Sequence, residues 1–260
     1  MSRHRSLRGR IPVSALTTTL LVLATMAPSA RAQQAWPQHS MDRPKPPVQA
    51  APAQQLPVKA PPGALVLFDG RDLGWWQKWD GSAAGWRVVD GAMEVVKGSG
   101  GIKTRVGFGD VRVHVEWASP KPAEGVGQDR GNSGVFLMGT YEVQVLDSYQ
   151  SDTYADGQAG AIYGQFPPSV NVARAPGEWQ SYDIEFHRPR FDSTGVVLAP
   201  ARLSVWHNGV KVQDDVALLG PTSHRVRAPY AQHADELPIS LQDHGHPVRF
   251  RNIWVQPLAP

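Results

Sequence analysis

The feature that most constrains the fold of this chain is an alternation of apolar and polar residues, which recurs in short segments from Leu65 onward. In the segment 110–117, DVRVHVEW, every second residue is valine or tryptophan, and polar or charged residues lie between them. A period of two indicates a β-strand with one buried face, whereas an amphipathic helix repeats every ~3.6 residues. Because no segment shows a convincing helical period, the sequence predicts an all-β fold.

Glycine, together with Asp or Asn, separates many of the alternating segments. Asp90-Gly91 divides the segment 86–96, and Asn208-Gly209 divides the segment 202–214. Both pairs tolerate the positive φ angles that two-residue hairpin turns require. We also expect two strands within 134–147, joined at Gly139-Thr140. Many short strands with such turns predict a two-sheet antiparallel sandwich of the jelly-roll or lectin-like kind.

The first residues of the chain have the pattern of an export signal. Residues 1–10 contain four arginines and no acidic residue, and an uncharged, largely apolar run ends at Ala30-Arg31-Ala32. This pattern predicts a secretory signal peptide over residues 1–32. The chain contains no cysteine, so neither disulfides nor a lipoprotein anchor is expected. We therefore expect a periplasmic or secreted protein.

The charge of the chain is concentrated in this signal. Without residues 1–32, 21 basic residues face 23 acidic ones, although the whole sequence has a pI of about 9.3. The basic pI is therefore no indication of nucleic-acid binding. No second long apolar run follows, so we expect no membrane association after signal cleavage. The oligomeric state is left open.

Composition divides the remaining chain into two parts. Residues 33–62 contain eight prolines, six glutamines and five alanines, with few large apolar residues. Such a segment buries too little apolar surface to offset its chain entropy, so we expect a disordered linker. Residues 63–260 form one predicted domain, long enough to bury a core without disulfides.

The segment 141–147, YEVQVLD, contains the first candidate site residues. Its odd-numbered residues from Tyr141 to Val145 are apolar, so Glu142 and Gln144 share the opposite face of the strand. Glu116 also lies on the non-core face of its strand. Two neighbouring carboxyls would raise the pKa of one of them, which suits general acid–base chemistry. The alternative interpretation is an ordinary solvated surface.

The segment 241–246, LQDHGH, contains the second group of candidates. Gln242 and His244 are alternate residues and share a face. A histidine can act as an acid, a base or a metal ligand. His244 and His246 with Asp243 could hold a divalent metal ion, but two histidines without a distant third ligand are a weak signal. A structural loop histidine fits equally well.

Other motifs narrow the chemistry. Gly131-Asn132-Ser133-Gly134 permits close backbone approach, but it is no G-x-S-x-G elbow, which argues against a serine hydrolase. Phosphate and dinucleotide fingerprints are absent from the sequence, so no organic cofactor is expected. The cluster Trp75-Trp76-x-x-Trp79 is compatible with core packing or with stacking on a sugar.

Several motifs together resemble the 3-keto-disaccharide hydrolase family, formerly a domain of unknown function. They follow the family order across nearly all of residues 65–257: LFDGRDLGWWQ (67–77), WRVVDGAM (86–93), GNSGVFLMGTYEVQVLD (131–147), GAIYGQFPP (160–168), PGEWQSYDI (176–184), HNGVKVQD (207–214) and LQDHGHPVRFRNIWV (241–255). The resemblance implies a concanavalin A-like jelly-roll sandwich, in agreement with the strand pattern.

The resemblance also implies an activity, the cleavage of oligosaccharides or other glycosides already oxidised to a ketone at C3. The ketone acidifies the C2 hydrogen, so a base can remove it and the C1 oxygen can leave. Water then adds to the resulting enone, which gives net hydrolysis. Such a site requires a base, an acid for the leaving oxygen and a group that stabilises the enolate oxygen.

Under this hypothesis we expect Glu142 to transfer the proton, with His244 as its partner; either residue is also a candidate metal ligand. The expected substrate-binding residues are Gln144 and Gln242 for sugar hydroxyls, the loop residues Asn132, Asp147 and Tyr163, and, as weaker choices, Glu116 and Arg251.

Two other functions remain open at this point. A carbohydrate-binding module could keep the same sandwich without catalysis, because fold alone does not fix function. An ordinary endo-glycanase of this fold predicts a paired-carboxylate motif such as E-x-D-x-x-E on one strand, and the sequence has none.

Overall fold

A computed structural model describes Met1 and residues 36–258. The predicted signal peptide therefore lies, apart from Met1, outside the described residues. All strand pairs are antiparallel, and the described residues form no α-helix and no helix long and apolar enough to span a membrane. The predicted all-β antiparallel sandwich is confirmed.

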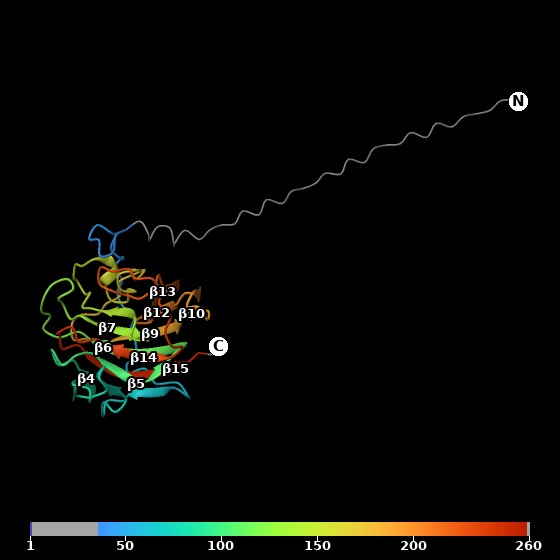
Figure 1. The fold of residues 1–260 in the computed structure, drawn as a ribbon. Helices are drawn as coiled ribbons and strands as arrows, with labels where there is room; N and C mark the ends of the chain where they lie inside the picture. Colours follow the sequence, from blue (N-terminus) through green and yellow to red (C-terminus); the bar gives the residue numbers. More distant parts are fainter. Residues whose placement is uncertain (2–35, 259–260) are drawn as a thin grey trace. The chain divides into compact units, whose positions relative to one another are not determined.

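Two sheets carry the fold (Figure 1). The larger sheet has the order β13 (Val210–Ala217), β12 (Arg202–His207), β9 (Gln180–His187), β6 (Val111–Ala118), β15 (Arg249–Pro257), β4 (Ala92–Glu94), β3 (Arg87–Val89), and β1 (Leu65–Phe68) pairs with β15. The five-stranded sheet has the order β2 (Trp76–Gln77), β5 (Ile102–Phe108), β14 (Leu237–Leu241), β7 (Ser133–Leu137), β8 (Tyr141–Val145). A small hairpin, β10 (Arg190–Phe191) with β11 (Val197–Ala199), and a 3-10 turn, η1 (Ala155–Gly157), complete the elements.

The predicted hairpin turns are present, with one shift. Asp90-Gly91 joins β3 to β4 and Asn208-Gly209 joins β12 to β13, and all four residues have positive φ. Between β7 and β8 the positive φ angles belong to Met138 and Gly139, not to Gly139 and Thr140. The tight turn therefore lies one residue earlier than the sequence predicted.

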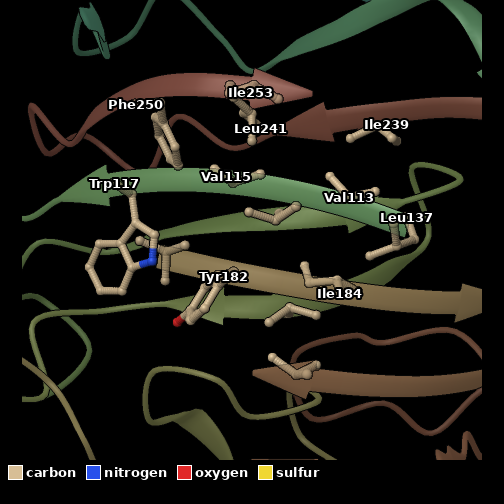
Figure 2. Packing of buried hydrophobic residues seen from close by; sticks show 14 of the residues in the cluster. Val113, Val115, Trp117, Leu137, Tyr182, Ile184, Ile239, Leu241, Phe250 and Ile253 are labelled. Carbon is tan, nitrogen blue, oxygen red and sulfur yellow. The ribbon is translucent and has the colours of Figure 1, made fainter. Parts of the chain in front are cut away.

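The core lies between the inner faces of the two sheets. Figure 2 shows Val115 and Trp117 of β6, Tyr182 of β9 and Leu241 of β14 among the buried side chains of one cluster. Phe250 of β15 is also fully buried there. Truncating a buried phenylalanine of this kind to alanine costs about 3–5 kcal/mol. The period-two pattern thus identified the inner residues correctly.

Residues 36–62 differ from the prediction of a disordered linker, and we call them the N-terminal strap. They belong to the same compact unit as the rest of the described chain. Arg43 is 5 % exposed, Val48 forms a β-bridge with Asn171, and the Gln54 side chain accepts a hydrogen bond from Ser181 Oγ at 3.1 Å. The composition argument fails because the strap is held by backbone and polar contacts, which apolar content does not measure.

Candidate functional site

The outer face of the five-stranded sheet forms the floor of the candidate site. Glu142 of β8 lies opposite Phe136 of β7, and Phe136 lies opposite Ser240 of β14. In the next row, Gln144 lies opposite Gly134. Residues directly opposite each other on antiparallel strands point to the same side, so their side chains meet above the sheet. Glu142 and Gln144, the candidate residues of the segment 141–147, therefore both lie on this floor.

A pocket of about 340 Å³ opens above this floor, within the size range of small-molecule sites. The pocket is lined by Asn132, Phe136, Glu142, Gln144, Tyr163, Thr222, Ser223, His224, Gln242 and His244. The structure thus brings together six of the residues predicted from the sequence: Asn132, Glu142, Gln144, Tyr163, Gln242 and His244.

Glu142 is held firmly and is almost completely withdrawn from water. Its backbone N–H donates to Thr222 Oγ1 at 3.0 Å, and its carbonyl accepts from the Tyr163 N–H at 3.2 Å. Its side chain occupies the space above Gly134, where an added Cβ would lie 2.3 Å from Glu142 Oε1. Burial raises the pKa of the Glu142 carboxyl to about 8. The group is therefore mostly protonated at neutral pH and becomes a strong carboxylate base once ionised.

Two glutamine amides present acceptors in the pocket. Gln144 Nε2 donates to Gln128 Oε1 at 3.0 Å and to Asn132 Oδ1 at 3.4 Å, which fixes the orientation of the amide. The Oε1 atoms of Gln144 and Gln242 are buried and accept no hydrogen bond from the residues that the structure describes. An unpaired buried acceptor costs about 1–3 kcal/mol. A ligand rich in hydroxyl groups would satisfy both atoms.

One wall of the pocket consists of hydroxyl and imidazole groups. The Tyr163 hydroxyl lies 2.9 Å from the Tyr154 hydroxyl and 3.1 Å from His224 Nδ1. Burial, with a further contribution from the nearby Glu142 charge, raises the pKa of Tyr163. The tyrosine therefore stays protonated and can donate a hydrogen bond to a developing negative charge.

His244 lies at the exposed rim of the pocket. Its ring stacks on that of His246 with centroids 6.2 Å apart, and His246 Nε2 lies 3.0 Å from Asp129 Oδ1. Within the described part of the chain, no group of three or more His, Cys, Asp or Glu side chains is arranged to hold a metal ion. The divalent ion considered for His244 and Glu142 stays a prediction without further support.

Glu116 and Arg251 do not belong to this pocket, contrary to the sequence prediction. They lie on β6 and β15 of the larger sheet, where Arg251 Nε contacts Glu116 Oε2 at 2.7 Å. Glu116 Oε1 also accepts from the Val58 N–H of the strap at 2.7 Å and from Asn252 Nδ2 at 2.8 Å. Glu116 is thus buried in a network of paired groups beneath the strap, and neither Glu116 nor Arg251 lines the pocket.

Asp147 does not line the pocket either, although the sequence predicted it as a substrate-binding residue. Its carboxylate is buried and accepts from Arg130 Nε at 2.7 Å, and it is absent from the pocket lining. It also accepts from the Tyr149 N–H at 3.2 Å, so it fixes the turn after β8. The residue has a structural role at the end of the strand.

Sequence reasoning missed four lining residues: Phe136, Thr222, Ser223 and His224. Phe136 occupies an outward-facing strand position, where a large apolar residue was a usable signal. The segment 220–224 forms no strand and carries no periodic pattern, so only the fold brings it beside Glu142.

The tryptophans of the cluster 75–79 differ in burial, so one fits core packing and another fits stacking on a sugar. Trp76 is fully buried and its Nε1 donates to Leu67 O at 2.9 Å, so it belongs to the core. Trp79 is 56 % exposed, with Lys103 Nζ 4.8 Å from its ring centroid and the ring edge against Gly139. Lys103 lies opposite Ser240 on the same floor as Glu142. Trp79 is therefore available for stacking at one side of the site.

The comparisons with known proteins agree with this geometry. Residues 63–256 match the sequence profile of a family described as the 3-keto-alpha-glucoside-1,2-lyase-like domain. A crystal structure of a "putative glycosyl hydrolase" from Parabacteroides distasonis ATCC 8503 is 44% identical, with a TM-score of 0.74, and the match covers 76% of this chain and 85% of that one.

Two further crystal structures from the same strain have the same description. They are 20% and 22% identical, with TM-scores of 0.53 and 0.55. The matches cover 76% and 75% of this chain and 95% and 99% of theirs, and at these identities they support the fold alone. Among curated proteins, none matches the chain.

Proposed function

The chain belongs to the 3-keto-disaccharide hydrolase family, and from this premise we propose that it cleaves glycosides whose sugar is oxidised to a ketone at C3. The family and the relative with 44% identity support the broader statement that the protein is a glycoside-cleaving enzyme acting on a carbohydrate substrate. The 3-keto substrate, the elimination mechanism and export are parts of the proposal.

The observation that carries the proposal is the buried carboxyl of Glu142 at the floor of a pocket with unpaired amide acceptors. The C2 hydrogen beside a ketone is a weak acid, so its removal requires a strong base. A carboxylate with a pKa of about 8 is a stronger base than an ordinary one. The amide oxygens of Gln144 and Gln242 would accept hydrogen bonds from sugar hydroxyls and hold C2 against the base.

In the first step, Glu142 takes the C2 proton and the electron pair moves into the C2–C3 bond, which gives an enolate oxygen at C3. The Tyr163 hydroxyl, held between Tyr154 and His224, would donate a hydrogen bond to this oxygen. A preorganised donor aimed at developing charge is a large contribution to catalysis in a water-poor site.

In the second step, the enolate collapses to a ketone and the bond between C1 and the leaving oxygen breaks. His244 at the pocket rim would protonate that oxygen, and the product is an enone with a double bond between C1 and C2. Water then adds at C1 and gives its proton to His244, and Glu142, whose carboxyl proton has exchanged with solvent, delivers a proton to C2. The sum of the steps is hydrolysis, and no redox partner is needed.

The test is to incubate the purified protein in heavy water with a 3-keto disaccharide and, separately, with the unoxidised parent. Parallel reactions contain a chelator or added divalent metal ions, and a reaction without protein measures spontaneous exchange at C2. Mass spectrometry then identifies the released sugars. We expect cleavage of the oxidised substrate only, with deuterium at C2 of the released 3-keto sugar above the level without protein.

The other outcomes distinguish the alternatives. Cleavage of the oxidised substrate without deuterium at C2 would contradict elimination and indicate direct displacement. Cleavage of the unoxidised parent would indicate an ordinary glycosidase. Binding of either sugar without cleavage in all reactions would indicate a carbohydrate-binding module.

We also propose that the protein is exported after cleavage of residues 1–32. The basic start, the apolar run and Ala30-Arg31-Ala32 support this part of the proposal. Expression of the full chain in a bacterial host, followed by fractionation and N-terminal sequencing, tests it. A mature protein in the periplasm or medium that begins near Gln33 is expected, and an uncleaved chain retained in the cytoplasm would contradict export.

A further inference from the structure

The head of the N-terminal strap, residues 38–45, lies outside the residues 63–256 that match the family, yet it contacts the wall of the pocket. Gln38 Nε2 donates to the carbonyl of Ser223 at 2.5 Å, and Ser223 lines the pocket. Gln38 also lies against Gly164, where an added Cβ would be 2.1 Å from Gln38 Nε2. The glycine next to Tyr163 therefore leaves the space that the strap occupies.

The His39 ring contacts both loops that form this wall, residues 154–165 and 220–227. Its ring centroid lies 4.3 Å from that of Tyr154 and 4.9 Å from that of His224, and both contacts are stacked. It also lies 5.1 Å from the Tyr163 ring in a tilted arrangement. Tyr154 and His224 are the two residues that hold the Tyr163 hydroxyl. His39 therefore joins the three groups into one cluster.

The contacts of His39 are those of a neutral stacking ring. Neither ring nitrogen forms a hydrogen bond with the residues that the structure describes. Burial lowers the pKa of His39 to about 4, so the imidazole carries no charge at neutral pH. Shape and surface, not charge, account for its contacts with Tyr154 and His224.

Buried polar groups anchor the strap head below this ring. Asp156 is fully buried; its Oδ2 accepts from the His39 N–H at 3.1 Å and lies 3.8 Å from Arg43 Nη1. The Asp156 carbonyl accepts from the Gly164 N–H at 2.8 Å, and Arg43 Nη1 donates to the Gln165 carbonyl at 3.3 Å. The strap is thus tied to both ends of the segment that carries Tyr163.

We propose that the strap head is part of the catalytic unit and that the His39 ring is a positioning residue for the Tyr163–His224 pair opposite Glu142. The proposal rests on the proposed function for its kinetic consequence, but its structural consequence can be measured without a substrate. Removal of the ring leaves a gap between the two loops. A displacement of about 1 Å in a catalytic group can lower the rate about a hundredfold.

Three variants test the proposal. His39→Ala removes the ring, whereas His39→Phe keeps a stacking ring of similar shape without the nitrogens. Gln54→Ala is the matched control, because it removes a strap hydrogen bond, to Ser181 on the larger sheet, and contacts no pocket residue. Circular dichroism and thermal unfolding identify variants that fail to fold.

Hydrogen–deuterium exchange is the first measurement, and it requires no substrate. In His39→Ala we expect faster exchange in the segments 154–165 and 220–227, and unchanged exchange there in His39→Phe and Gln54→Ala. Unchanged exchange in His39→Ala would overturn the proposal.

Kinetics with a 3-keto disaccharide is the second measurement. We expect kcat of His39→Ala to fall about tenfold to a hundredfold with a smaller change in KM, and His39→Phe to restore it. Normal kcat in His39→Ala, or an equal loss in His39→Phe, would overturn the positioning role of the ring. Faster exchange in His39→Ala without turnover by the unaltered protein would contradict the proposed function and support the structural role of the strap.

Discussion

The substitution Glu142→Gln replaces a buried carboxyl by an amide of nearly the same shape. Its effect on stability follows from the pKa of Glu142, about 8 in the folded protein against an ordinary value of 4.5. Because the folded-state pKa is the higher one, the folded protein binds the proton more tightly than the unfolded chain. The stability linked to this proton is fully present below about pH 4.5 and is lost as pH rises to about 8.

The magnitude is large for a single group. The difference between the two pKa values corresponds to about 5 kcal/mol at 1.36 kcal/mol per pH unit. Relative to a residue that does not titrate, the ionising group lowers the free energy of unfolding by about 1 kcal/mol at pH 5, ~3 at pH 7 and ~5 at pH 9. Between pH 5 and pH 9, the free energy of unfolding of Glu142→Gln should therefore rise by about 4 kcal/mol relative to that of the unaltered protein.

The assay is urea unfolding of both proteins at pH 5, 7 and 9. The difference between variant and unaltered protein at each pH cancels the titration of all other groups. For a domain of this size, about 4 kcal/mol corresponds to a relative shift in Tm of about 10 °C. The same variant should lose turnover of a 3-keto disaccharide, because the amide cannot accept the C2 proton.

Glu116→Gln is the matched control, since Glu116 is equally buried but paired. Burial alone would raise the pKa of Glu116, but hydrogen bonds from His114, Asn252, Val58 and Arg251 bring it below its ordinary value. Its contribution to stability is therefore present at neutral pH and lost as pH falls, and its variant should show the opposite pH dependence. A stability difference for Glu142→Gln that stays constant from pH 5 to pH 9 would refute the reasoning about Glu142.

Four further predictions follow from the site and its surroundings. The protein-catalysed exchange of the C2 hydrogen of a 3-keto sugar, which needs the Glu142 base but not the acid for the leaving oxygen, should rise about tenfold per pH unit up to about pH 8 and then level; a profile flat between pH 6 and 9 would exclude Glu142 as the base. Gln144→Leu should raise KM about tenfold or more without loss of fold, because one sugar hydroxyl loses its partner; an unchanged KM in steady-state kinetics would remove Gln144 from the binding site. Arg251→Met should cost about 3–5 kcal/mol in urea unfolding, because it leaves a buried carboxylate without its cation, while kcat stays unchanged; a selective loss of kcat would return Arg251 to the site. Trp79→Ala should weaken disaccharide binding measured by calorimetry, whereas Trp206→Ala, which removes a ring with the same 4.8 Å lysine contact on the other sheet, should not; equal effects would exclude a sugar platform at Trp79.

The sequence by itself determined most of the local structure. The hairpin turns at Asp90-Gly91 and Asn208-Gly209 follow from residues that accept positive φ, and the structure contains both. The side of the strand on which Glu142 and Gln144 lie follows from the alternation alone, because successive side chains of a strand point to opposite faces. For the same reason, the all-β class and the buried face of β6 were predictable.

Only the tertiary structure decided what covers each face. Glu116 and Glu142 have the same local pattern, a carboxyl between valines or aromatics on the non-core side. Glu116 is paired with Arg251 beneath the strap, whereas Glu142, at the floor of a pocket, has no ion-pair partner among the described residues. His224 and His39, which build the wall opposite Glu142, come from segments without strand periodicity. Alternation fixes a side chain relative to its own strand, whereas burial, charge pairing and pKa depend on segments distant in the sequence that the fold brings against it.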